Sequence, residues 1–241
     1  MSTTVKLALS NLEVNRIFTR ELRPKISFYQ DMMGKVIGLV KRAKSQQVYA
    51  LLALYQIDQS IQAIIQSFYD EIDKFEGLLE RKKHLAGKTF THKPVYFPEV
   101  SFDNGIANTL VELFEVYDRL ISQLKTLRTA GCFANDDDYF SNLRRYFKTI
   151  NHLLSQIMLV SLKDLPSVTF TDAVENTDDY QLSAKIHGEV DLTVLVHALK
   201  SNLAPRLEEK IRQPLLQRLK KRLHPVVENK VAVVLLEHEV V

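Results

Sequence analysis

The sequence predicts a mainly α-helical protein with small β elements, in which long antiparallel helices form the core. Two observations carry this prediction. Apolar residues recur at spacings of three and four over long segments, which is typical of helices packed on helices. Seven glycines and seven prolines among 241 residues are few for the many turns of a β-sandwich. With 46% hydrophobic and 25% charged residues, the composition is that of an ordinary globular protein.

Residues 1–44 are predicted to form a strand followed by two helices. In the strand, Val5, Leu7 and Leu9 would share one face. The opposite face would carry Thr4, Lys6 and Ala8. A first helix would start at Ser10, where Glu13 gives the spacing of a capping box, and a second would run from about residue 26 to residue 44.

Residues 45–165 are predicted to be an antiparallel core of three helices joined by short links. The first helix, at about 45–85, has a seam with a period near 3.5: Val48, Leu51, Tyr55, Ile61, Ile65, Phe68, Ile72, Phe75 and Leu79. Asp58 falls on this seam, either as a functional carboxylate or where the partner helix has diverged. The second helix spans about 106–127. The third follows the acidic cap at Asp136–Asp138 with the stripe Tyr139, Leu143, Phe147, Ile150, Leu154, Ile157 and Val160.

Residues 166–241 are predicted to be a mixed α/β region. Alternation and turn residues favour short strands between 167 and 196. An amphipathic basic helix with a kink at Pro214 follows, and the β-branched end, 229–241, would form a strand.

Composition also limits the function classes. The net charge of +3 permits nucleic-acid binding without requiring it. The single cysteine, Cys132, excludes an intrachain disulfide and suits a reducing cytoplasm. The N-terminus does not resemble a signal peptide, and no window approaches eighteen uncharged apolar residues, so we predict a cytoplasmic protein without a membrane span.

No catalytic constellation is evident in the sequence. Phosphate-binding loops, nucleophile elbows and HExxH zinc motifs are missing, so we predict a protein that is not an enzyme and has no cofactor or metal. Asp136–Asp138 could ligate a hard cation, but helix capping is the simpler interpretation. Cys132 has no candidate base beside it in the sequence.

Basic residues give the main functional signal. The last predicted helix carries a cluster that could neutralise DNA phosphates: Arg212, Arg218, Lys220, Lys221 and Arg222. A second cluster comprises Lys35, Lys41, Arg42 and Lys44. Either cluster could equally be a solvated helix face.

The order strand, helix, turn, helix in residues 1–44 matches a ribbon-helix-helix element. In that fold two chains pair their strands into a ribbon that enters the major groove of double-stranded DNA. Residues 1–44 are therefore the candidate for DNA binding and for homodimerisation, with Thr4, Lys6 and Ala8 facing the bases. An ordinary edge strand is the alternative, and residues 184–222 offer a second strand-and-helix unit of similar length.

The middle of the chain resembles a known family. The segments "QQVYALLALYQIDQSIQAI" and "KPVYFPEVSFDNGIANTLVELFEVYDRLISQLKTLRTAGCFANDDDYFSNLRRYFKTI", the run Tyr117-Asp118-Arg119-Leu120 and "KVIGLVKR" are similar to the integrating-conjugative-element protein family that includes AcaB-type transcriptional activators. The acidic-aromatic stretch and the turn of that family are altered here. The resemblance implies sequence-specific DNA binding by a dimer that controls conjugative-transfer genes.

The leading hypothesis is therefore a dimeric DNA-binding transcriptional regulator, an activator rather than a repressor, of a conjugative or mobile genetic element. Such a regulator could also contact the transcription machinery. The alternative is a non-catalytic helical scaffold or adaptor of the conjugation machinery, in which the basic clusters are solvated and the terminal strands mediate assembly.

Overall fold

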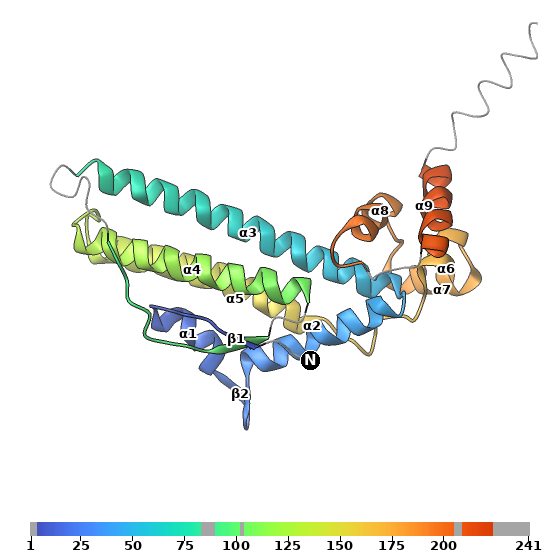
Figure 1. Ribbon diagram of the computed structural model, residues 1–241, viewed down its shortest axis with the longest axis horizontal. Coiled ribbons are helices and arrows are strands. Elements are labelled where there is room, and N and C mark those ends of the chain that lie inside the picture. Colours follow the sequence, from blue (N-terminus) through green and yellow to red (C-terminus); the bar gives the residue numbers. More distant parts are fainter. Residues whose placement is uncertain (1–3, 83–89, 102–103, 205–208, 224–241) are drawn as a thin grey trace, which may run out of the picture. The chain divides into compact units, whose positions relative to one another are not determined.

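The computed structural model describes residues 4–82, 90–101, 104–204 and 209–223 (Figure 1). The contacts divide the chain into two units. The first comprises Met1–Leu39 with Leu54–Lys163, and the second comprises Val40–Ala53 with Asp164–Val241. Residues 1–39 thus group with the long helices. The strand predicted at 229–241 lies outside the described residues.

The predicted fold class is confirmed, because the described residues are mainly helical with small β elements. The elements of the first unit, two of which continue into the second, are β1 (Thr4–Lys6), α1 (Leu12–Thr19), β2 (Glu21–Arg23), β3 (Ile26–Ser27), α2 (Phe28–Lys44), α3 (Val48–Glu80), β4 (Glu99–Ser101), α4 (Gly105–Thr129) and α5 (Asp136–Leu159). Those of the second unit are α6 (Phe170–Glu175), α7 (Asp178–His187), α8 (Leu192–Lys200) and α9 (Glu209–Leu223).

Helices α3 and α4 run parallel, which corrects the expected antiparallel arrangement of the core. Near the start of α4, Thr109 donates a hydrogen bond to Asp58 of α3. Further along α4, Arg119 pairs with Glu76 of α3. Residue numbers therefore rise in the same direction along the two helices. Residues 90–101 return along the bundle in a largely extended course (Figure 1), and at about 3.3 Å per residue they cover most of its length. Helix α5 is antiparallel to α4, as predicted.

Aromatic packing joins the three long helices. Phe68 of α3 stacks on Tyr117 of α4 and meets Tyr146 of α5 edge-on, both at 5.8 Å between ring centroids. Most of the predicted α3 seam is buried, whereas Tyr55 and Asp58 are half-buried. On α5 the predicted stripe is wrong at Phe147, which is 45% exposed, because the neighbouring Tyr146 faces the core instead.

Helix α3 is also long and apolar enough, by length and composition alone, to be a candidate membrane span. The expectation from the sequence concerned a stricter pattern, eighteen uncharged apolar residues, which α3 does not contain because Asp58 and several glutamines interrupt it. A core helix of a helical bundle passes the same test, and the α3 seam is buried against α4 and α5.

The opening strand β1 pairs with a strand of its own chain. It lies antiparallel to β4, with Val5 opposite Val100 and Lys6 opposite Glu99. Beyond β1 the pairing continues, because the Leu7 and Leu9 amides donate to the carbonyls of Pro98 and Tyr96. The strand therefore has a partner within its own chain, whereas the ribbon-helix-helix interpretation pairs it with the strand of a second chain. Leu7 and Leu9 are buried as predicted, but Val5 is 42% exposed.

A buried carboxylate holds the start of α1. The N-cap residue is Asn11 rather than Ser10, and its side chain does not cap the helix, so the expected Ser10–Glu13 capping box is wrong. Instead, the backbone amides of Ser10 and Asn11 donate to Asp118 of α4 at 2.9 and 3.0 Å. Lys125 donates to Asn11 Oδ1 and pairs with Glu13, each at 2.9 Å.

The second unit contains helices where short strands were expected. Residues 170–200 form α6, α7 and α8, because the polar residues interpreted as turns are N-caps. Thr169 and Asp172 make a complete capping box for α6, Thr177 caps α7, and Asp191 caps α8. The start of α3 packs here, where the Val48 amide donates to the Val168 carbonyl.

Candidate nucleic-acid interface

The predicted reading face of β1 is exposed, but it also carries an acid. Thr4, Lys6 and Ala8 all lie at the surface. Residues directly opposite in an antiparallel pair project to the same side, so Glu99 lies beside Lys6. The Leu7 and Leu9 amides point to residues 96–98, and hence the amides of Lys6 and Ala8 point to the other edge of the strand. That edge pairs with no other strand among the described residues.

The basic cluster of α9 divides into two pairs of cations. Leu215 and Leu219 bury one side of the helix. On this side Arg218 pairs with Glu175, at the end of α6. Arg222 donates to the carbonyls of Ala173 and Val174, at 3.2 and 2.7 Å, so it satisfies acceptors left open in the last turn of α6.

The other pair, Lys220 and Lys221, is exposed and makes no ion pair within the part of the chain that the structure describes. Arg212 belongs to α9, but its side chain lies outside the described residues. The structure thus leaves two of the five predicted α9 cations projecting into solvent and uses two to dock the helix.

The second predicted cluster does not form one patch. Lys35 donates to the Val160 carbonyl within the first unit at 3.2 Å. Arg42 donates to Gln47 and to the Leu165 carbonyl within the second unit. Lys41 and Lys44 are exposed in the last turn of α2. Two of the four cations therefore have a local structural role.

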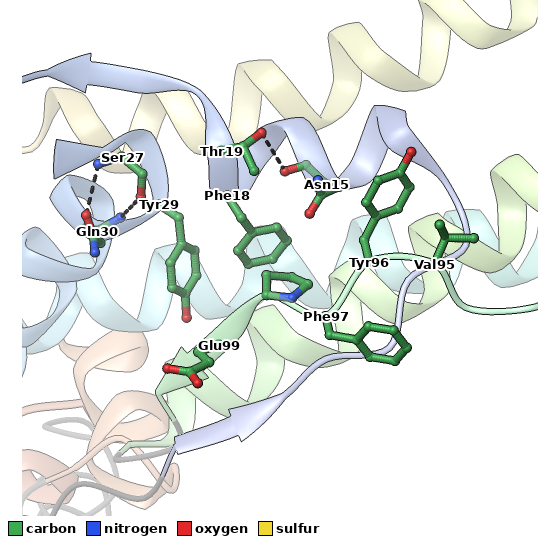
Figure 2. A pocket seen from close by; sticks show the side chains of 11 residues that line it. Asn15, Phe18, Thr19, Ser27, Tyr29, Gln30, Val95, Tyr96, Phe97 and Glu99 are labelled. Carbon is green, nitrogen blue, oxygen red and sulfur yellow. Dashed lines mark hydrogen bonds between the residues drawn. The ribbon is translucent and has the colours of Figure 1, made fainter. Parts of the chain in front are cut away.

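A groove of about 530 Å³ lies between the end of α1, the start of α2 and the extended residues 95–99 (Figure 2). Phe18 and Tyr29 form its apolar wall, with ring centroids 4.9 Å apart. Glu99 is the one charged residue in the lining, and no histidine or cysteine faces the groove. The hydroxyl groups of the lining therefore have neither a histidine nor a lysine beside them in the lining.

Two of the perturbed carboxyl groups, Glu71 and Asp58, make contacts between helices. Burial would raise the pKa of the Glu71 carboxyl, but hydrogen bonds from Tyr146 and Lys74 and the charge of Arg145 lower it. Tyr146 donates to Glu71 at 2.6 Å, which joins α5 to α3. Burial raises the pKa of Asp58, although the hydrogen bond from Thr109 opposes this rise. No group of three or more potential metal ligands occurs among the described residues.

The run Tyr117-Asp118-Arg119-Leu120, which carried part of the family resemblance, has a structural role. Tyr117 and Leu120 are buried in the core, Asp118 holds the start of α1, and Arg119 pairs with Glu76 of α3. Asp118 is a key residue that sequence reasoning did not single out. The sequence did contain a signal for this role, since Asp118 is a carboxylate on a helix face that is otherwise apolar.

Comparison with known proteins identifies the family to which this chain belongs. A family model described as a transcriptional regulator matches residues 16–208, most of the chain. The chain therefore belongs to the AcaB transcriptional regulator family, and the resemblance expected from the sequence is confirmed.

Among solved structures, the crystal structure of selenomethionine-containing AcaB from uropathogenic E. coli is similar. The match has 12% sequence identity and a TM-score of 0.46, and covers 84% of this chain and 98% of that one. A search of curated proteins gives no match.

Proposed function

We propose that this protein is a sequence-specific DNA-binding transcriptional regulator, an activator, of a conjugative or mobile genetic element, and that it acts as a homodimer. The match of residues 16–208 to the AcaB transcriptional regulator family carries this proposal. In this role the protein works in the cytoplasm, binds double-stranded DNA and contacts the transcription machinery. It needs no cofactor and catalyses no reaction.

The proposed phosphate contacts come from α9. Lys220 and Lys221 extend from a helix that is fixed by Leu215, Leu219 and the two docking arginines. Free ammonium groups on a fixed helix neutralise phosphates and release counterions, which gives binding that weakens steeply with salt. Arg212 belongs to the proposed set, and Arg218 and Arg222 contribute at the edge of the same surface.

The proposed dimer contact is the free edge of β1. Two copies pairing there would form a four-stranded sheet in the order β4, β1, β1 and β4, with Thr4, Lys6 and Ala8 of both chains on one face. The backbone amides of Lys6 and Ala8, which point away from β4, supply the pairing. Glu99 beside Lys6 reduces the positive potential of this face, so base reading there depends on close contact rather than on charge.

The test is binding of the purified full chain to duplex DNA from the promoters of its own gene neighbourhood, with a scrambled duplex as competitor and a salt series. We expect tighter binding to one promoter than to the scrambled duplex, and a steep loss of affinity with salt. Sedimentation of the complex then gives the number of chains bound. If micromolar protein gives no salt-dependent shift, the regulator proposal is wrong and the scaffold alternative takes its place.

A further inference from the structure

A small basic hairpin joins α1 to α2 in the first unit. Strands β2 and β3 pair antiparallel, with Arg23 opposite Ile26 (Figure 1). Every residue from Thr19 to Ile26 is exposed, in contrast to the buried Phe18 and Tyr29 that flank the hairpin. The segment carries three cations, Arg20, Arg23 and Lys25, against a single acid, Glu21. The charge of the exposed segment is therefore predominantly positive.

The tip of the hairpin holds a lysine in a conformation that glycine adopts more easily. Lys25 follows Pro24 and has a φ of 67°, in the left-handed region. A residue with a Cβ pays an energetic cost in this region, which turns usually avoid with glycine or asparagine. Here the turn instead places an ammonium group at the exposed tip of the hairpin.

The cations of the hairpin are weakly engaged within the chain. Arg23 approaches Asp31 only to 3.9 Å, and its side chain is 65% exposed. Arg20 lies 6.0 Å from the ring of Phe28, which orients the guanidinium without neutralising it. Lys25 makes no ion pair among the described residues. These charges remain available to a partner.

A groove of about 680 Å³ continues the basic surface beside the hairpin. Its lining comes from β3, from α2 and from the residues after α5, and it includes Ile26 and Lys163. Lys35 lies in its lining, and Gly34 leaves the helix surface open, since nothing lies within 4 Å of where a Cβ would be. Asp31 is the single acid in the lining. Cations thus occur at intervals along the groove.

We propose that the hairpin, residues 20–27, contacts the phosphate backbone of double-stranded DNA, with Arg23 and Lys25 on neighbouring phosphates and the groove beside Lys35 and Lys163 following the strand. This contact rests on the proposed function and adds a surface separate from α9 and β1. Phosphate contacts position a protein without reading sequence, so the hairpin contributes equally to target and random DNA. Only Leu22 and Ile26 are exposed apolar side chains in the hairpin, too few to favour a membrane surface.

The test compares three variants of the full chain. Arg23→Ala/Lys25→Ala removes two of the three hairpin cations, and Arg144→Ala/Lys148→Ala is the matched control, since both residues are exposed cations of α5. Lys25→Gly removes one charge and also removes the energetic cost of holding a residue with a Cβ in the left-handed conformation. Binding is measured on the promoter duplex and on a random duplex across a salt series, with melting temperature measured in parallel.

We expect the double hairpin variant to bind both duplexes about tenfold more weakly, with a salt slope smaller by about 2, and the α5 control to match the wild type. Lys25→Gly should bind more weakly while its melting temperature stays equal or rises, which separates charge from folding. If the hairpin variants bind DNA as the control does, the inference is wrong.

Two further probes identify a different partner. Poly-glutamate represents an acidic peptide, and phosphatidylglycerol vesicles represent an anionic membrane surface. A hairpin variant that loses either interaction while keeping its DNA affinity contradicts the inference in favour of that partner. If the wild-type protein binds no duplex at all, the proposed function itself fails. If the wild type binds and the hairpin variants bind equally, only the hairpin contact fails.

Discussion

Two of the regions proposed to contact DNA, the ribbon formed by β1 and β4 and helix α9, are held by different interactions. The chain after β1 is anchored by buried hydrogen bonds, in which Asp118 accepts from the backbone amides of Ser10 and Asn11. Helix α9 is docked by two leucines and by the surface arginines Arg218 and Arg222. The chain beside the ribbon is therefore anchored to α4 by buried polar contacts, whereas α9 uses arginines for docking and lysines for its external charge.

This difference shows that a basic cluster in a sequence overstates the charge available to a ligand. Arg218 and Arg222 lie one turn apart on the side of α9 that carries Leu215 and Leu219, whereas Lys220 and Lys221 face away. On β1, likewise, Lys6 faces outward but beside Glu99. In both regions the usable charge depends on neighbours that are distant in sequence.

The largest expected effect is on the anchor of the ribbon. Asp118→Ala leaves the backbone amides of Ser10 and Asn11 without their acceptor, at a cost of about 3 kcal/mol. The Asn11 side-chain amide keeps the Asp118 backbone carbonyl and the Ser122 hydroxyl as acceptors. For a chain of this length, each kcal/mol lowers the melting temperature by roughly 2–4 °C. Calorimetry should therefore show a fall of roughly 6–12 °C. Asp73→Ala, an exposed position on α3, is the control, and equal melting temperatures for the two variants would contradict the anchoring role.

The second prediction separates the two kinds of α9 cation. Lys220→Ala/Lys221→Ala should lower DNA affinity about tenfold, on target and random DNA alike, and flatten the salt slope without changing stability. Arg218→Ala/Arg222→Ala should instead lower the free energy of unfolding by about 1 kcal/mol, because α6 loses the donors to its last carbonyls. Binding titrations and urea unfolding of both variants give the answer, and a loss of stability in the lysine variant would reverse these roles.

The third prediction concerns the outer face of the ribbon. If this face reads DNA, Lys6→Ala should weaken binding to the target by about threefold more than binding to random DNA. Glu99→Gln should strengthen binding to both, because it removes a negative charge beside the phosphates. Competition titrations measure both ratios. Should neither substitution alter binding, Thr4, Lys6 and Ala8 would be residues of an ordinary edge strand.

The smallest effect is expected for a substitution of Asp58, a half-buried residue of α3. Burial raises the pKa of Asp58, so the folded state disfavours its charged form and the ionised carboxylate costs stability above this pKa. Asp58→Asn should therefore stabilise the protein at neutral pH and lose this advantage as the pH falls below the ordinary range of a carboxyl. Melting temperatures of both proteins between acidic and neutral pH test this sign. A gain that grows toward low pH would contradict it.

Local signals in the sequence predicted much of the fold. Periodicity located the long helices, and Asn135 with the acidic residues after it starts α5, as the capping interpretation expected. The direction of α3 relative to α4 could not be predicted, because it depends on the extended course of residues 90–101 along the helices. Thr169, Thr177 and Asp191 were misjudged because N-caps and turns use the same short polar residues.

Less of the candidate nucleic-acid interface could be predicted from the sequence. Exposure of Thr4, Lys6, Ala8, Lys220 and Lys221 agrees with the surface roles predicted for them, but their DNA contacts remain predictions. The docking of Arg222 on α6 and the position of Glu99 beside Lys6 are contacts between residues far apart in sequence, which no local pattern encodes. The β2–β3 hairpin was missed because residues 1–44 were interpreted as a single strand followed by two helices.

The most direct test of the central claim is the affinity of the wild-type protein for its own promoter duplex and for a scrambled duplex, measured from low to high salt. We expect tighter binding to the promoter at every salt concentration and a linear fall of log affinity with log salt on both duplexes. Equal affinity for the two duplexes would contradict sequence-specific regulation, and an affinity that does not change with salt would contradict the phosphate contacts proposed for α9 and for the hairpin.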